Sequence, residues 1–363
     1  MQVIHGEPSI PVRSSATTAW VTVRGAHVAP VEFDLGDRIV QPYSLSPWTP
    51  QEQQDQIPLL QVLRGDFFCL PFGAQDAGPP HGVVAGETWT VIEEKPGSVT
   101  LRMDAEDIGA TVTKTVEVRD GDTSLYQQFD IAGLDGEYNY GTHPILDMSA
   151  YPLGSVELTT SPVRWASVAP TLFSDPARGE HQTLRIGSAF TSLDAVPRED
   201  GDVLDLRHLP TTPGHEDLVM LVPEVTSGLA WSALRFPDYV WFALRRVEDF
   251  PATVLWISNG GRSQAPWSSR HMARIGIEDV CAYFAEGHGP SIANPLAAQG
   301  ITTSRRFTSD QTVRLRVVQA VAALPADFGS VTQILDRDGH AVLADEDGHE
   351  VVTGTSTAYV LGS

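Results

Sequence analysis

The stretch Ala110 to Val118, ATVTKTVEV, alternates polar and apolar residues almost without interruption, which is typical of a half-buried β-strand. The same two-residue period recurs along most of the chain, whereas the 3.6-residue period of an amphipathic helix is nearly absent. The 31 glycines and 26 prolines are spread over the whole length, so turns are available between many short strands. The pattern predicts an all-β protein of the sandwich class rather than an α/β fold.

Further strands are predicted wherever this alternation is bounded by turn residues. They cover residues 20–23, 31–35, 87–91, 99–103, 125–131, 217–222, 228–236, 239–245, 253–257, 273–278 and 312–322. No composition break divides the 363 residues, and large all-β folds often form one domain of this size. We therefore expect a single domain in which residues 1–325 form a β-sandwich. Residues 326–363, with Asp-Gly-His turns at 338–340 and 347–349, would add a hairpin-rich extension.

Charge and cysteine content restrict the possible partners. The net charge of −22 argues against binding to nucleic acid or to an anionic membrane surface. No apolar run is long enough to span a membrane and no signal sequence opens the chain, so the expected location is cytoplasmic. Cys69 and Cys281 belong to no metal-ligand pattern, and we interpret both as buried thiols. The acidic turns near the C-terminus lack the spacing of a calcium loop, so no metal is expected.

The segment from Arg64 to Trp89, RGDFFCLPFGAQDAGPPHGVVAGETW, combines three side chains suited to a polyhydroxylated ring. Arg64 offers a fixed fork of donors, His81 exchanges protons near neutral pH, and Trp89 offers an apolar platform. A structural interpretation stands beside this one, because a single histidine is often a satisfied core residue and a single arginine is often an ion-pair partner.

Two further acid–base candidates lie far away in sequence, His143 in YGTHP and Glu278 in RIGIED. Residues i and i−2 of a strand share a face, so His143 lies beside Gly141, and Glu278 lies beside Gly276. Glycine within a strand often marks the close approach of a ligand. On this reading the adjacent acid, Asp279, points to the opposite face.

These segments resemble the aldose 1-epimerase (galactose mutarotase-like) family, and most closely its hexose-6-phosphate-mutarotase-like branch. Arg64 to Trp89 is similar to the family form R-G-G…P-W-F-G…H-G-F-A-R…W, and residues 141–144 (GTHP) to the segment of the second family histidine. Residues 253–284 are similar to the tryptophan strand and the glycine-rich strand that carries the base glutamate. Residues 202–207 (DVLDLR) are similar to a recurring family turn. The resemblance spans roughly residues 20 to 320 in consistent order.

The resemblance implies a galactose mutarotase-like β-supersandwich that interconverts the anomers of a free sugar or sugar derivative without metal or cofactor. It implies Glu278 as the general base, His143 as the acid to the ring oxygen, and His81 as an assisting hydrogen-bond donor. Arg64 would hold substrate hydroxyls, and Trp256 is either a sugar platform or a core aromatic. A substrate-binding acid is expected near residues 214–218; Asp217 is our candidate, and Glu216 remains open.

Two positions depart from the family pattern, and the second of them bears on the substrate. Asp279 follows the glutamate where the family usually has proline, and Ala85 replaces the arginine four residues after the first histidine, which disfavours a phosphorylated sugar. The main alternative function is non-catalytic carbohydrate binding or sensing on the same fold. Glycoside hydrolysis ranks last, because no second carboxylate lies in a comparable glycine-flanked strand.

Overall fold

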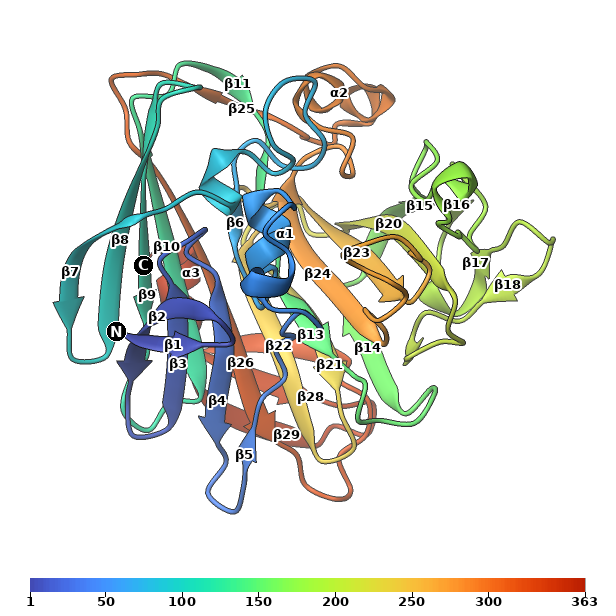
Figure 1. Ribbon diagram of the computed structural model, residues 1–363. Coiled ribbons are helices and arrows are strands. Elements are labelled where there is room, and N and C mark those ends of the chain that lie inside the picture. Colours follow the sequence, from blue (N-terminus) through green and yellow to red (C-terminus); the bar gives the residue numbers. More distant parts are fainter. Residues whose placement is uncertain (363) are drawn as a thin grey trace.

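The computed structural model describes residues 1–362, and two large antiparallel sheets dominate it (Figure 1). The nine-stranded sheet has the order β19-β14-β21-β22-β26-β10-β9-β8-β7. Its strands are β7 (Thr90–Lys95), β8 (Ser98–Ala105), β9 (Ala110–Glu117), β10 (Ser124–Ala132), β14 (Val156–Thr160), β19 (His208–Leu209), β21 (Leu229–Arg235), β22 (Tyr239–Arg246) and β26 (Val313–Ala323). Seven of these strands were predicted from the polar–apolar alternation, with ends shifted by a few residues, whereas β14 and β19 were not predicted.

The second large sheet has eight strands in the order β16-β15-β20-β23-β24-β12-β6, with β13 also paired to β24. Its strands are β6 (Phe68–Cys69), β12 (Tyr140–Thr142), β13 (Ile145–Asp147), β15 (Val163–Val168), β16 (Ala189–Phe190), β20 (His215–Pro223), β23 (Ala252–Asn259) and β24 (Arg274–Cys281). The strands β6, β12, β13, β15 and β16 were not predicted.

Smaller elements complete the molecule. An N-terminal sheet contains β1 (Gln2–Ile4), β2 (Glu7–Arg13), β3 (Thr17–Thr22), β4 (Val28–Asp34) and β5 (Ile39–Val40). Two small pairs are β11 (Gly136–Tyr138) with β25 (Arg305–Phe307), and β17 (Val196–Pro197) with β18 (Val203–Leu204). The α-helices are short: α1 (Pro58–Val62), α2 (His288–Ile292) and α3 (Thr357–Leu361). Short 3₁₀ helices lie at Pro50–Glu52, Val83–Ala85, Pro176–Arg178, Leu193–Ala195 and Pro295–Gln299.

The main core lies between the two large sheets and is continuous with the N-terminal sheet. Phe129 of β10 stacks on Phe68 of β6 with ring centres 4.3 Å apart, which joins the two large sheets directly. Ile275 and Ile277 of β24 enter the same core, as their alternation predicts. The opposite side chains of β24 are therefore turned to the outer face of the eight-stranded sheet.

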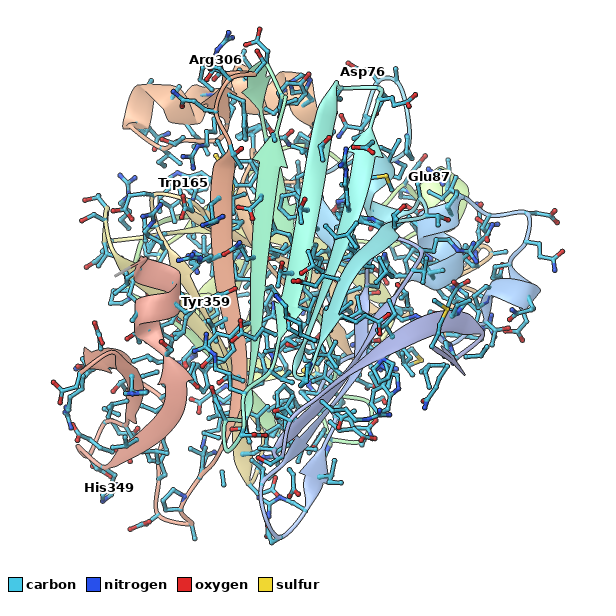
Figure 2. All side chains as sticks on the ribbon, turned by 90° about the vertical axis from the view of Figure 1, so that its left-hand side faces the viewer. Asp76, Glu87, Trp165, Arg306, His349 and Tyr359 are labelled. Atoms are coloured by element: carbon cyan, nitrogen blue, oxygen red, sulfur yellow. The ribbon has the colours of Figure 1, made fainter. Side chains whose placement is uncertain are left out.

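The outer face of the nine-stranded sheet is covered by the C-terminal part of the chain. The hairpins β27 (Gln333–Arg337), β28 (His340–Ala344) and β29 (Glu350–Ser356), with α3, pack against apolar side chains of β21, β22 and β26. Figure 2 shows Tyr359 of α3 beside this sheet, and its ring centre lies 5.0 Å from that of Tyr126. Asp338 and Gly339 both have positive φ, as a two-residue hairpin turn requires. The division into a sandwich up to residue 325 and an extension after it stays an interpretation.

Three further observations concern the cysteines, groups of possible metal ligands, and helices long enough to span a membrane. Both cysteines are buried free thiols, as predicted. Within residues 1–362, no three His, Cys, Asp or Glu side chains are grouped so that they could hold a metal ion. No helix in the same range is long and apolar enough to cross a membrane.

Candidate active site

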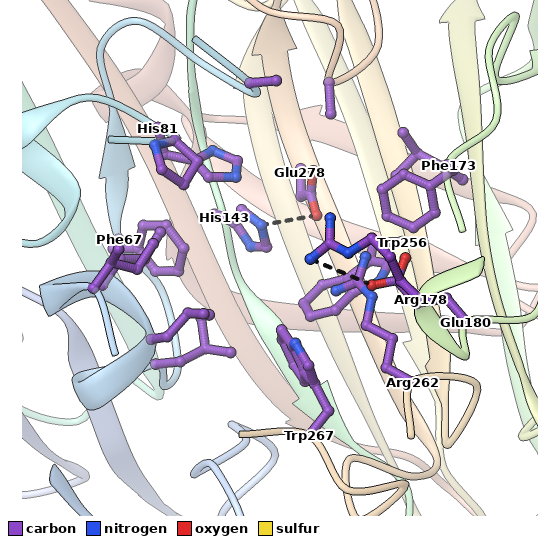
Figure 3. A pocket seen from close by; sticks show the side chains of 18 residues that line it. Phe67, His81, His143, Phe173, Arg178, Glu180, Trp256, Arg262, Trp267 and Glu278 are labelled. Carbon is purple, nitrogen blue, oxygen red and sulfur yellow. Dashed lines mark ion pairs between the residues drawn. The ribbon is translucent and has the colours of Figure 1, made fainter. Parts of the chain in front are cut away.

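A cavity of about 390 Å³ opens on the outer face of the eight-stranded sheet, a volume within the usual ~300–1,000 Å³ of small-molecule sites. One wall is apolar and comes mainly from the segment around α1, while charged side chains from two loops form the opposite wall (Figure 3). The lining side chains belong to Ile57, Leu59, Leu60, Leu63, Phe67, Ala74, Pro80, His81, His143, Phe173, Arg178, Glu180, Leu218, Trp256, Arg262, Trp267, Glu278 and Ala285. All three predicted acid–base residues are among them.

Sheet register brings His143 and Glu278 together. The antiparallel pairing with β24 runs from Gly141 opposite Val280 to Ile145 opposite Gly276, so His143 lies directly across from Glu278. Directly opposite side chains of neighbouring strands stand on the same face. His143 Nε2 is 3.2 Å from Glu278 Oε1, and Figure 3 shows both groups at the floor of the cavity.

Few contacts compensate for the burial of the Glu278 carboxylate. It is only 2 % exposed, and its Oε1 has no hydrogen-bond partner among residues 1–362. Burial raises the pKa of Glu278 well above its usual range, because a carboxylate loses its hydration there. Gly276 leaves room for this side chain: a Cβ at that position would lie 2.5 Å from Oε1. Asp279 points to the other face, where it pairs with Arg245 of β22 at 3.0 Å, as expected from strand alternation.

The second predicted glycine neighbour behaves differently. A Cβ at Gly141 would meet Val280 Cγ1 at 2.7 Å and Phe72 Cδ2 at 2.9 Å. This glycine therefore permits close packing of the protein on itself. The expectation that it marks the approach of a ligand is wrong.

His143 is fixed through its backbone and by a stacked ring. Its N–H donates to the Phe67 carbonyl at 2.9 Å and lies 2.9 Å from Asp66 Oδ1, while its imidazole stacks on the Phe67 ring at 4.5 Å. Nδ1 has no hydrogen-bond partner in the described part of the chain. Burial lowers the pKa of His143 well below its usual range, and the nearby His81 lowers it further.

His81 stands half-buried beside His143, with ring centres 5.1 Å apart. The Gly73 backbone N–H donates to its Nδ1 at 3.3 Å, so the neutral ring carries its proton on Nε2. Burial lowers the pKa of His81 to about 4, which keeps this ring neutral. Its φ of 64° lies in the left-handed region, which costs a non-glycine residue about 1–3 kcal/mol and is often found at functional sites.

The Glu278–His143 pair can hold one proton between the two groups. Burial penalises both ionised forms, so it favours the form with the proton on Glu278 and a neutral His143. Transfer over 3.2 Å would give a carboxylate and an imidazolium without any exchange with water. A ligand whose hydroxyl groups solvate these charges would favour that transfer. The arrangement can therefore remove one proton from a bound molecule and deliver another.

Trp256 lies in the cavity, on β23 beside Gly276. Its ring stands edge-on to His143 at 5.7 Å and stacks on His271 at 5.3 Å. The indole N–H donates to Glu216 Oε2 at 3.0 Å, which fixes the ring plane. Trp256 thus supplies an aromatic surface next to the acid–base pair.

Arg64 lies outside the cavity, which corrects the expectation that it holds substrate hydroxyls. Its guanidinium is buried and donates to the backbone carbonyls of Ile4, His5 and Val62 at 2.8, 3.1 and 3.1 Å. These bonds tie the N-terminal strand pair to the segment after α1. Arg64 therefore has a structural role, and the sequence did not reveal that distant carbonyl groups occupy its donors.

Asp217 also lies outside the cavity, because it faces the core side of β20. Its Oδ1 accepts from the N–H groups of Thr183 and Leu184 at 3.0 and 2.8 Å, and its Oδ2 lies 2.6 Å from His215 Nδ1. The choice of Asp217 as a substrate ligand is therefore corrected. Glu216 faces the site side, but its oxygens are occupied by Trp256, Ser258 and Gly261.

The charged wall of the cavity was not predicted. Arg178 and Glu180 belong to the loop between β15 and β16, and Arg262 follows the end of β23. Loops carry no periodic pattern that places their side chains. The one available signal was the position of Arg262 directly after Asn259-Gly260-Gly261, at the end of the strand that carries Trp256.

Comparisons with known proteins agree on the fold. No family model matches the sequence, and a search of curated proteins finds no significant match. Among solved structures, a candidate aldose 1-epimerase from Escherichia coli K12 is similar with a TM-score of 0.60 and 12% identity, over 88% of this chain and 100% of that one. A galactose mutarotase-like protein from Lactobacillus casei has a TM-score of 0.55 and 15% identity, over 86% and 100%.

An aldose epimerase homologue from Caenorhabditis elegans gives a TM-score of 0.58 at 12% identity, over 88% of this chain and 100% of that one. The fold is mostly β, with several antiparallel sheets, and it matches that of galactose mutarotase-like structures. At this level of identity the likeness defines the fold alone. The chemistry has to be argued from the cavity.

Proposed function

We propose that the protein is an aldose 1-epimerase, which interconverts the α and β anomers of a sugar by general acid–base catalysis. One observation carries the proposal: Glu278 and His143 stand opposite each other at the floor of a cavity, with open hydrogen-bonding capacity on both groups. The fold shared with aldose epimerases and mutarotases supports it.

Ring opening needs two proton transfers. The Glu278 carboxylate takes the proton from the C1 hydroxyl, and the His143 imidazolium gives a proton to the ring oxygen. The C1–O bond of the ring breaks while the C1 carbonyl forms, so the charges on the two side chains are neutralised. Rotation about the C1–C2 bond and reversal of both transfers close the ring as the other anomer.

The remaining groups have supporting roles in this proposal. The His81 Nε2–H donates a hydrogen bond to the sugar near the ring oxygen, since Gly73 already occupies its Nδ1. Trp256 offers an apolar surface for one side of the ring. Positioned acid–base groups contribute about 10²–10⁴ each in rate, which is ample for a reaction that proceeds slowly in water.

The test is the exchange of anomers in free aldoses such as glucose and galactose, followed by polarimetry or by NMR saturation transfer. Catalytic amounts of protein should accelerate the exchange. Saturable binding of these sugars without any acceleration would instead support carbohydrate binding or sensing. Release of nitrophenol from a nitrophenyl glycoside would support glycoside hydrolysis and contradict the proposal.

A further inference from the structure

We propose that the cavity accepts an aldose carrying a single carboxylate group, as a hexuronate does, and that Arg262 binds this carboxylate. The inference rests on the proposed function, because it takes the anomeric carbon to lie at Glu278 and the acidic end of the sugar to lie at the charged wall. Figure 3 shows Arg262 on the far side of the cavity from His81.

The guanidinium of Arg262 is held in place yet lacks a close partner. Its carbon lies 4.8 Å from the ring centre of Trp267, 5.1 Å from that of Phe173 and 5.6 Å from that of Trp256. Nε has no hydrogen-bond partner within residues 1–362, and the oxygen that pairs with it, Glu216 Oε2, is 4.0 Å away. Its side chain is only 15% exposed. A guanidinium so far withdrawn from water gains most from a bound anion.

The two loops that form the charged wall are joined by backbone hydrogen bonds. The N–H of His181 donates to the Gly261 carbonyl at 2.9 Å, and the N–H of Ser263 donates to the Gly179 carbonyl at 3.1 Å. Gly179 has φ of +69°, and a Cβ there would lie 2.3 Å from Ser263 Oγ. Arg262 is therefore set on a constrained backbone, so little ordering is needed when a ligand binds.

The charges at this wall favour a monoanion. Arg178 and Arg262 bring two positive charges, and Glu180, whose Oε1 lies 4.0 Å from Arg178 Nη2, brings one negative charge. The wall thus carries a net charge of about +1, and Glu216 lies behind it. A planar carboxylate also matches the fork of a guanidinium in two parallel hydrogen bonds. A phosphoryl group with two negative charges would exceed the positive charge of the wall and would be repelled by Glu180.

The experiment compares binding of glucuronate, glucose and glucose 6-phosphate, and likewise galacturonate with galactose, by calorimetry or NMR titration at neutral pH. We expect the hexuronate to bind at least about tenfold more tightly than the neutral aldose. Arg262→Met should remove this preference, so that its affinities for the hexuronate and for the neutral sugar lie within about threefold of each other, because the methionine still packs on the aromatic rings but carries no charge. Arg270→Met, an exposed arginine of the same loop outside the cavity, should keep it.

Three results would overturn the inference: equal affinity for the neutral and acidic sugars, tighter binding of glucose 6-phosphate, or an equal loss for all ligands in Arg262→Met. A different combination of results would show that the proposed function is wrong while the binding inference holds. In that case hexuronate binding would depend on Arg262, but the wild-type protein would not accelerate anomer exchange in any of these sugars.

Discussion

Two buried glutamates on the same face of the eight-stranded sheet have opposite environments. Glu216 on β20 accepts from the Trp256 indole and the Ser258 hydroxyl at 3.0 Å each, and from the Gly261 N–H at 3.2 Å. Glu278 on β24 has only His143 nearby, and its Oε1 accepts no hydrogen bond within residues 1–362. The two side chains are equally buried, at 1 % and 2 % exposure.

The difference separates a structural carboxylate from one suited to catalysis. Burial raises the pKa of Glu216 to about 7, although Arg262 and the three donors oppose the rise. For Glu278 burial raises the pKa well above its usual range, and no donor opposes the rise. A carboxylate saturated with protein donors has little capacity left for a substrate. An unsaturated one that faces an imidazole across a cavity keeps that capacity.

The largest expected effect is on catalysis. Glu278→Gln should lower kcat/KM for anomer exchange by about 10²–10⁴, because the amide cannot take the C1 hydroxyl proton. Glu216→Gln should change the rate by less than about tenfold. Polarimetry with both variants, each first shown to be folded by circular dichroism, checks this contrast. Equal decreases in kcat/KM in the two variants would show that the two glutamates do not differ in their contribution to catalysis.

The second prediction concerns stability. Glu216→Gln should lower the free energy of unfolding by about 1–3 kcal/mol, since its new NH₂ group faces donors of the protein and leaves at least one unsatisfied. Denaturant titration measures the loss. A variant as stable as the wild type would mean that the hydrogen bonds to Glu216 contribute nothing to the fold.

A third variant tests whether hydrogen-bond saturation is the cause. Val254 of β23 lies directly opposite Glu278, so Val254→Thr brings a hydroxyl beside that carboxylate, as Ser258 is beside Glu216. The donor should lower the pKa of Glu278 and reduce kcat by roughly tenfold through competition with the substrate. Val222→Thr, on the same face but outside the cavity, controls for the cost of burying a hydroxyl. If both variants keep the full rate, saturation is not what distinguishes the two glutamates.

The fourth prediction concerns the pH dependence of stability. A carboxyl whose pKa is higher in the folded than in the unfolded chain weakens folding as pH rises above the unfolded value of about 4.3. The folded pKa of Glu278 is raised, so Glu278→Gln should have a higher Tm than the wild type at pH 7, and the difference should shrink towards pH 4. A difference that does not vary with pH would show that Glu278 titrates normally.

Local patterns in the sequence predicted part of this site. Strand alternation correctly turned Glu278 towards one face and Asp279 towards the other, and it identified Gly276 as an empty neighbour. Strand alternation could not decide whether Glu216 or Asp217 faces the site, because both are acidic and the sequence does not show which face of β20 packs on the core. The structure decides this through Leu218 and Met220, which share the site face with Glu216.

Other features depend on contacts between distant parts of the chain. His143 meets Glu278 only because β12 and β13 flank it and pair with the same strand, and no local pattern encodes that register. Arg64 was predicted to bind substrate because the sequence does not show that the carbonyls of Ile4 and His5 accept its hydrogen bonds. The charged wall arises from two loops whose backbone bonds join residues 179–181 to residues 261–263.

If Glu278 and His143 share one proton during catalysis, the pH dependence of kcat/KM has to show it. The rate of Glu278→Gln at each pH serves as the background to subtract. Activity should fall in acid, where the pair takes up a second proton at His143, whose pKa is lowered. It should also fall in alkali, where the pair loses its shared proton from Glu278, whose pKa is raised. We expect a broad plateau of kcat/KM across neutral pH with a decline on both sides. A rate that rises steadily with pH, or that equals the background throughout, would contradict it.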